Sequence, residues 1–175
     1  MKGTINGSLH DAQKTLTNNT KEINEHNTIV DLIRNDLSKV AKEVKVTRFR
    51  YMDKIKTQKN EIFHTSSEIR GKLFKEWKKQ LPEILLSMLP AGSICGAPKE
   101  KTVSIIREVE QEKRGYYTGI FGFFDGENLD SAVNIRYLEK HQGEIRYRSG
   151  GGITSLSDLE SEYNELIEKI YVPVI

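Results

Sequence analysis

The sequence predicts an α+β fold, with antiparallel sheets and flanking helices. A stripe of apolar residues at gaps of three and four, from Ile23 to Val40, indicates one long amphipathic helix. Runs of alternating character that are rich in β-branched and aromatic residues, at 44–52 and 62–69, predict strands. Glycines between the later strand-like runs predict the tight turns that join antiparallel strands.

The composition bounds the class of protein. The 175 residues form one domain of ordinary size, which we expect to span residues 1–175. Lys and Arg number 27 against 25 Asp and Glu, so the net charge of +2 gives no reason to expect a nucleic-acid partner. No apolar run is long enough to span a bilayer, and no signal peptide is visible, so we expect no membrane partner. The single cysteine, Cys95, allows no internal disulfide and fits a cytoplasmic location.

The first half of the chain is expected to run from a loop into a helix and two strands. Residues 3–20 are polar and rich in Gly, Asn and Thr, which predicts a loop. Asn19 is a good N-cap for the long helix, with Glu22 at its third position. The strands at 44–52 and 62–69 follow, and we expect them to pair with each other.

The middle of the chain is expected to hold two helices separated by a turn. Residues 77–89 predict the first helix, and the segment PAGSICGAP predicts the turn. Pro98 is well placed as the first residue of the second helix, which we expect to reach Val109.

The last third predicts an antiparallel meander followed by a helix. The three strands are expected at 116–124, 131–139 and 144–148, with Gly126 and Gly143 in the turns. Three glycines, 150–152, then lead to a final helix. A capping box of Ser157 and Glu160 is expected to start that helix, and Pro173 to stop it.

Two carboxylate pairs are the first chemical signal. Glu22 and Glu25 lie three residues apart on one predicted helix, and Glu162 and Glu165 repeat that spacing on another. Such pairs are ordinarily solvated surface. If the two helix ends faced each other, however, the oxygens would suit Mg²⁺. The face that carries Glu25 continues through the apolar Ile29, which favours a partner for a carboxylate beside buried surface.

Other polar residues each allow two interpretations. His64 is either structural or an acid–base group. Arg136 is expected in a strand, as either a solvent-facing residue or a clamp for a carboxylate. The run SGGGIT is either a flexible connection or a backbone site for an anion. Cys95 suits a small core residue better than a nucleophile. Lys2, in the opening MKGT, is either a solvated charge or a nucleophile.

Taken in order, six segments resemble the chorismate-utilising enzymes, a family that includes component I of aminodeoxychorismate synthase (para-aminobenzoate synthase), component I of anthranilate synthase, and the isochorismate and salicylate synthases. They are DLIRND (Asp31 to Asp36), GSICGAPK (Gly92 to Lys99), GYYTGIFG (Gly115 to Gly122), VNIRY (Val133 to Tyr137), SGGGIT and ESEYNE (Glu160 to Glu165). The ordered set covers nearly the whole chain. The resemblance implies a sandwich of two large sheets with helices outside, of which this chain is expected to be the C-terminal portion, with the N-terminal half absent.

The lysine of MKGT makes aminodeoxychorismate synthase the nearest resemblance within the family. The resemblance implies that Lys2 attacks C2 of chorismate while the C4 hydroxyl leaves, and that ammonia then adds at C4 and expels the lysine. It also implies Mg²⁺ as cofactor, a glutamine amidotransferase subunit (component II) as the source of ammonia, and a place in folate biosynthesis. An anthranilate or isochorismate synthase type of reaction is the alternative.

The resemblance also implies roles for single residues. Glu25 and Glu165 would be the main Mg²⁺ ligands, with Glu22 and Glu162 in support, and His64 would lie near the departing hydroxyl. Cys95 stands where many relatives have a threonine that lines the substrate site. The pyruvyl carboxylate of chorismate would be held by Tyr117, Arg136, Lys169 and the backbone N–H groups of Gly150 and Gly152.

A second hypothesis concerns assembly. Half of a sandwich fold leaves apolar faces uncovered, so we expect a homo-oligomer or a partner chain that supplies the missing N-terminal half. On this hypothesis the isolated chain folds without being a sufficient catalyst.

Overall fold

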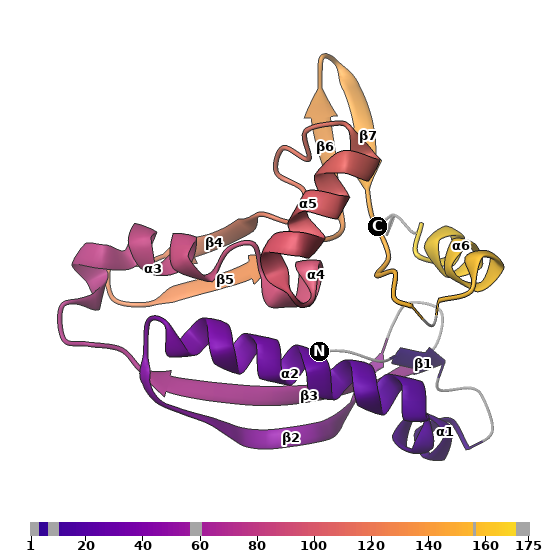
Figure 1. Ribbon diagram of the computed structural model, residues 1–175, viewed down its shortest axis with the longest axis horizontal. Helices are drawn as coiled ribbons and strands as arrows, with labels where there is room; N and C mark the ends of the chain where they lie inside the picture. Colours follow the sequence, from indigo (N-terminus) through magenta and orange to yellow (C-terminus); the bar gives the residue numbers. More distant parts are fainter. Residues whose placement is uncertain (1–3, 7–10, 57–60, 156, 171–175) are drawn as a thin grey trace. The chain divides into compact units, whose positions relative to one another are not determined.

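The computed structural model describes residues 4–6, 11–56, 61–155 and 157–170 (Figure 1). They belong to two compact units, Met1–Val109 and Glu110–Ile175. Both units combine helices with antiparallel strand pairs, which confirms the predicted α+β class.

The first unit is built on a three-stranded antiparallel sheet in the order β1-β3-β2. Strands β2 (Lys42–Lys56) and β3 (Glu61–Lys72) form the long hairpin that the alternating runs predict. Strand β1 (Thr4–Asn6) pairs with the other edge of β3. The predicted loop at 3–20 is therefore wrong in part, because it contains β1 and also helix α1 (Ala12–Asn18).

The local sequence could not show either element. Strand β1 exists by pairing with β3, which is far away along the chain. Helix α1 begins after Asp11, a residue type that favours helix starts, but its side chain makes no capping hydrogen bond here.

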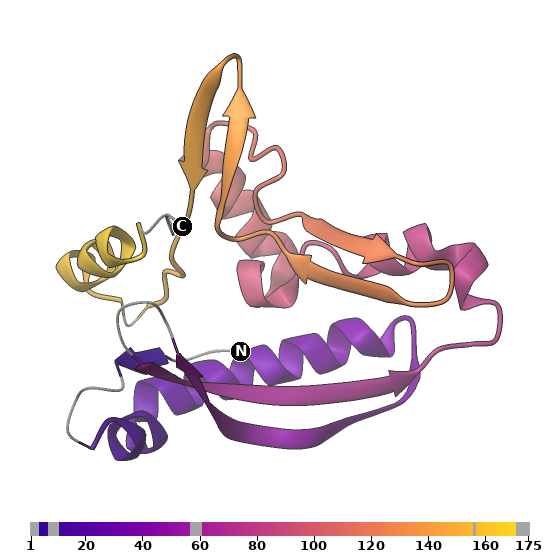
Figure 2. The ribbon, with the colours of Figure 1, turned by 180° about the vertical axis from the view of Figure 1, so that it is seen from behind.

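Helix α2 (Thr20–Ser38) packs along the sheet, as Figures 1 and 2 show. Its N-cap is Asn19, whose side-chain oxygen accepts a hydrogen bond from the backbone N–H of Glu22 at 3.2 Å. This confirms the predicted start of the helix. His26 and Val30 are buried on the side that faces the sheet.

After the hairpin the chain forms a series of short helices and then a longer one. A 3₁₀ turn at Trp77–Gln80 leads into α3 (Leu81–Met88), which together match the helix predicted at 77–89. The segment predicted as a plain turn contains one helical turn, α4 (Gly92–Cys95). Helix α5 (Lys99–Glu110) begins one residue after Pro98, close to the prediction.

The second unit holds two separate strand pairs rather than the predicted meander. Strands β4 (Ile120–Phe124) and β5 (Leu129–Val133) pair with each other, and β6 (Tyr137–His141) pairs with β7 (Glu144–Arg148). The predicted strand at 131–139 is broken because Asn134 bonds to the turn before β4. Its N–H donates to Gly119 O, and its carbonyl accepts from Thr118 N–H, both at 2.8 Å.

Helix α6 (Leu159–Glu168) closes the second unit, and its cap differs from the prediction. Asp158 is the N-cap and accepts a hydrogen bond from Ser161 N–H at 3.0 Å. Ser157 instead donates its hydroxyl proton to Glu162, so the predicted Ser157–Glu160 box is wrong by one position. The predicted stop at Pro173 lies outside the described residues. Within them, no helix has the length and apolar character needed to cross a membrane.

Candidate active site

Glu22 belongs to the stripe of α2 that packs on the sheet. It lies one helical turn before His26, which is 2% exposed and has Nε2 2.7 Å from Ser67 Oγ of β3. The Oε2 atom of Glu22 is buried and has no hydrogen-bond partner among the described residues. A buried carboxylate oxygen requires a partner, and a divalent cation is a suitable one, so Glu22 fits a role in metal binding.

Glu25 belongs to the neighbouring stripe of the same helix. Its side chain is one fifth exposed and lies 4.0 Å from Lys21 Nζ. The same stripe continues to Leu32 and Asp36, where α4 approaches so closely that a Cβ on Gly92 would lie 2.9 Å from Leu32 Cβ. Helix α2 is thus covered on two sides, by the sheet and by the α4 segment, and carries one glutamate on each side.

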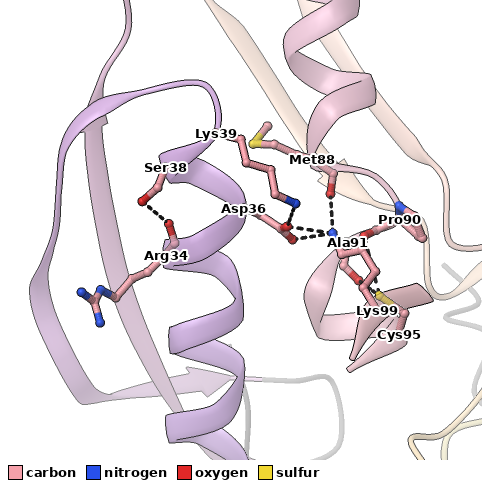
Figure 3. A network of polar contacts seen from close by, with 9 residues as sticks. All are labelled: Arg34, Asp36, Ser38, Lys39, Met88, Pro90, Ala91, Cys95 and Lys99. Atoms are coloured by element: carbon pink, nitrogen blue, oxygen red, sulfur yellow. Dashed lines mark hydrogen bonds and ion pairs between the residues drawn. The ribbon is translucent and has the colours of Figure 1, made fainter. Parts of the chain in front are cut away.

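A buried charge network joins α2 to the GSICGAPK segment (Figure 3). Asp36 is 6% exposed and accepts hydrogen bonds from Lys99 Nζ at 2.7 and 2.9 Å and from Lys39 Nζ at 2.8 Å. Lys99 also donates to Met88 O at 3.4 Å. Burial alone would raise the pKa of Asp36, but the hydrogen bonds and positive charges of the two lysines outweigh it and hold the pKa below its usual value. Sequence reasoning did not single out Asp36 or Lys99, although both lie in segments that carry the family resemblance.

Cys95 lies at the end of α4, beside this network, and is 2% exposed. Its thiol donates to the backbone oxygen of Ala91 at 3.3 Å, and Pro90 O lies 3.8 Å away (Figure 3). Burial raises the pKa of the thiol, so the group is protonated near neutral pH. This environment favours a small core residue over a nucleophile, as the sequence suggested. Contact of Cys95 with a substrate stays a prediction.

His64 lies in the middle strand of the sheet, between β1 and β2. It is 6% exposed, and its Nδ1 atom is buried without a hydrogen-bond partner among the described residues. Its cross-strand neighbour in β1 is Thr4. Lys2 itself lies outside the described residues, but Thr4 is the fourth residue of the same MKGT segment.

Tyr117 and the glycine loop meet in the second unit. A Cβ added at Gly150 would lie 2.1 Å from Tyr117 Oη, so only glycine leaves room for the phenol at this place. Burial is the main cause that raises the pKa of Tyr117, and the nearby charges of Arg114 and Arg136 partly oppose it. A protonated phenol against a glycine backbone can donate a hydrogen bond to a carboxylate.

Arg114 supports Tyr117 and was missed by the sequence reasoning. Its guanidinium carbon lies 5.4 Å from the centre of the Tyr117 ring. Two of its nitrogens bind Glu110, at 2.7 and 2.5 Å, and a third donates to Thr118 Oγ1 at 3.2 Å. The only sequence signal was the i, i+4 spacing of Glu110 and Arg114, which is common on exposed helices.

Arg136 lies in the break between β5 and β6 and not inside a strand. The prediction that Arg136 lies in a strand is therefore wrong. Its charge acts on Tyr117, so these two of the predicted carboxylate-binding residues share one neighbourhood of the second unit.

Helix α6 carries the second glutamate pair and brings Glu162 beside the glycine loop. Glu162 Oε1 accepts from Ser157 Oγ at 2.6 Å, and its Oε2 lies 4.0 Å from the place of a Cβ on Gly151. Glu165 Oε1 lies 2.5 Å from Lys169 Nζ. The backbone oxygen of Lys169 accepts from Tyr147 Oη at 2.8 Å, which ties the helix end to β7.

The predicted site residues that the structure describes thus fall into two groups, one in each unit. Within the described residues, no three His, Cys, Asp or Glu side chains gather into a metal-binding group, and the two glutamate pairs belong to different units. The glutamates remain candidate ligands, supported by the buried oxygen of Glu22. The first unit holds Glu22, Glu25, His64 and Cys95; the second holds Tyr117, Arg136, Gly150, Gly152, Glu162, Glu165 and Lys169.

Comparison with known proteins identifies the family. The profile of the chorismate binding enzymes matches residues 1–174, so the chain belongs to this family. An uncharacterized PabA-like protein from Pasteurella multocida is 62% identical over 174 residues, covering 99% of this chain and 54% of the relative. An uncharacterized PabA-like protein from Haemophilus influenzae is 58% identical, covering 99% of this chain and 53% of the relative. The chain therefore spans about half the length of these curated relatives.

A solved structure supports the same assignment. Anthranilate synthase component I from Streptococcus pneumoniae superposes with a TM-score of 0.77 at 32% sequence identity. The match covers 91% of this chain and 36% of that one. The fold described above is therefore that of a chorismate-utilising enzyme.

Proposed function

We propose that this chain is the C-terminal catalytic portion of an Mg²⁺-dependent enzyme that converts chorismate and ammonia to 4-amino-4-deoxychorismate in folate biosynthesis. The observation that carries the proposal is the register of β1, in which Thr4 of MKGT is the cross-strand neighbour of the buried His64. Lys2 precedes Thr4 by two residues in the sequence, and we propose that its amine acts on the substrate beside this imidazole.

The proposed reaction uses Lys2 as a covalent nucleophile. Its amine forms a bond to C2 of chorismate, the two ring double bonds shift to C1=C6 and C4=C5, and the C4–O bond breaks with loss of water. Ammonia then bonds to C4, the C2–N bond breaks, and the lysine amine is released. The balance is chorismate plus ammonia to aminodeoxychorismate plus water.

His64 is the proposed proton carrier in both steps. It gives a proton to the departing C4 oxygen and takes one back from the ammonia nitrogen after addition. The support is its burial beside the MKGT strand and the unpaired Nδ1 among the described atoms.

The second unit supplies the proposed carboxylate site. Tyr117 donates from a protonated hydroxyl, Arg136 supplies a positive charge, and the loop at 150–152 supplies backbone N–H groups. Lys169, the C-cap of α6, is proposed as a second cation for the carboxylate, and in the structure it pairs with Glu165.

The proposed Mg²⁺ ligands are Glu22, Glu25, Glu162 and Glu165. For Glu22, the support is a buried carboxylate oxygen that has no hydrogen-bond partner among the described residues. The bound ion would neutralise the ring carboxylate of chorismate and polarise the ring. The proposed partners are a glutamine amidotransferase subunit, which delivers ammonia, and a second copy or a separate chain that completes the fold. We place the reaction in the cytoplasm.

Incubation with chorismate, Mg²⁺ and an ammonium salt tests the proposal, with the product identified by mass spectrometry. We expect aminodeoxychorismate from the wild type, and a fall to background with Lys2→Ala. Lys14→Ala, which removes an exposed lysine of the first unit from helix α1, is the matched control and should keep activity. Product formation that survives Lys2→Ala would contradict the nucleophilic role.

Anthranilate formation is the second candidate, because the solved structure reported above is an anthranilate synthase component I. The same incubation distinguishes the two reactions. Anthranilate and pyruvate are formed in one case, and aminodeoxychorismate without pyruvate in the other.

A further inference from the structure

We propose that Asp53 is a positioning residue for His64, which fixes the ring so that Nδ1 is the nitrogen that meets the substrate. The inference rests on the proposed function and adds a residue to it. Asp53 lies in β2 and is the direct cross-strand neighbour of His64 in β3. Directly opposed residues of an antiparallel pair have their side chains on the same face of the sheet.

The two ring nitrogens of His64 have different surroundings. Nε2 lies 3.6 Å from Asp53 Oδ2. That distance is longer than a hydrogen bond, but such contacts are often long before a substrate binds and shorten when it does. Nδ1 is buried and has no partner among the described residues. The arrangement therefore leaves one nitrogen for a carboxylate of the chain and the other for a ligand.

On this proposal, Nε2 forms the hydrogen bond to Asp53 and Nδ1 transfers the proton. A carboxylate that accepts from Nε2–H holds the neutral ring in the tautomer whose Nδ1 carries no proton. It also stabilises the charged ring, in which Nδ1 carries the proton that the departing oxygen needs. After that transfer, Nδ1 is free to take a proton from the nitrogen that has added at C4. The imidazole thus loses one proton in the first step and regains one in the second, and Asp53 takes up no proton in either step.

The position of Asp53 suits this role. Its side chain is about half exposed, so the carboxylate keeps contact with water while the imidazole is buried. In the same hairpin, Lys54 Nζ forms an ion pair with Glu61 Oε2 at 2.7 Å, so the neighbouring lysine already has a carboxylate other than Asp53.

Nuclear magnetic resonance of the histidine rings tests the inference without needing turnover. In protein with ¹⁵N-labelled histidine, long-range proton–nitrogen correlations show which ring nitrogen carries the proton. The His64 signals are those that disappear in His64→Gln. We expect neutral His64 to be protonated at Nε2 in the wild type, and a large share of the Nδ1–H form in Asp53→Asn. Asp53→Glu, which keeps the carboxylate, should largely restore the wild-type form.

Kinetics provide the second readout. If the proposed amination is observed, Asp53→Asn should lower kcat by about 100-fold or more and leave KM nearly unchanged. Glu61→Gln, on the same hairpin, is the matched control and should change neither the tautomer nor kcat.

The outcomes separate the two proposals. A wild-type His64 protonated at Nδ1, or a tautomer that does not respond to Asp53→Asn, would overturn the inference. The expected tautomer shift in a protein that does not aminate chorismate would support the role of Asp53 and count against the proposed reaction.

Discussion

At the scale of single residues, the close approach of the Tyr117 hydroxyl to the Gly150 backbone is the feature of the second unit that a substitution can test most directly. A methyl group at Gly150 would overlap the phenol oxygen, since its place lies 2.1 Å from Tyr117 Oη. The overlap is with the free end of a side chain, which can move away at little cost to the fold. The proposed carboxylate site would then lose an aligned donor while the protein keeps its stability.

We therefore expect Gly150→Ala to weaken chorismate binding by about 10-fold or more, the worth of one hydrogen bond to a charged group. The free energy of unfolding should change by less than about 1 kcal/mol. Titration calorimetry and chemical denaturation measure the two quantities.

Gly151→Ala is the matched control, because its Cβ would meet nothing closer than Glu162 Oε2 at 4.0 Å. Equal losses of binding in the two variants would show that the loop, and not the fit against Tyr117, determines the effect.

The sequence identified a candidate site residue only where that residue belongs to a recognisable motif. The residues of SGGGIT and VNIRY could be singled out because they occur in recognisable segments. Arg114 and Asp53 could not, because their importance depends on a neighbour that only the folded chain supplies. Arg114 lies over Tyr117, and Asp53 lies opposite His64 through the register of β2 and β3.

At the scale of elements, the Asp36 network holds the α4 segment against α2 (Figure 3). Removing the charge with Asp36→Asn leaves Lys99 with a weaker partner in a site that is only one fifth exposed at the lysine side chain. We expect a loss of about 2 kcal/mol in the free energy of unfolding. That is less than the loss for a fully buried pair, because both lysines can turn toward solvent.

The effect should depend on pH in a definite direction. The pKa of Asp36 is lowered in the folded state, so its contribution to stability is complete above the unfolded pKa of about 4 and is lost as the pH falls through the lower folded pKa. Wild type and Asp36→Asn should therefore differ at pH 7 and converge in strong acid.

Denaturation at several pH values between 2 and 7 measures this convergence. Asp31→Asn on the exposed side of the same helix, where Arg34 is the partner, is the control and should show a small effect throughout. A difference between wild type and Asp36→Asn that is the same at all pH values would contradict the account.

The elements themselves were predictable where local pattern and tertiary structure agree. The β2–β3 hairpin, α2 with its Asn19 cap, and α5 follow from alternation, period and caps. The features that the sequence did not predict depend on residues far away along the chain. Strand β1 forms only by pairing with β3. The break between β5 and β6 is accompanied by backbone hydrogen bonds from Asn134 to the turn before β4.

At the scale of the whole molecule, large apolar side chains remain exposed. Phe121 and Phe123 of β4 are 59% and 74% exposed, and Ile145 of β7 is 74% exposed. The chain spans about half the length of its curated relatives. Surfaces of this kind associate, so we expect self-association of the purified chain.

Light scattering after size-exclusion chromatography measures the mass. We expect a species larger than the 20.1 kDa monomer, and a shift toward the monomer when Phe121 and Phe123 are both changed to Ser. A monomeric wild type at high concentration would contradict the expectation. Lys140→Ser, an exposed polar change in β6, is the control.

The long strand β2 has a consequence for how such association can proceed. It lies at the edge of its three-stranded sheet, its pairing with β3 shifts register three times, and it carries six Lys or Arg residues along its length. Irregular, highly charged edges are poor templates for adding a strand from another molecule. Copies of this chain should therefore not add to one another backbone to backbone along the edge of β2.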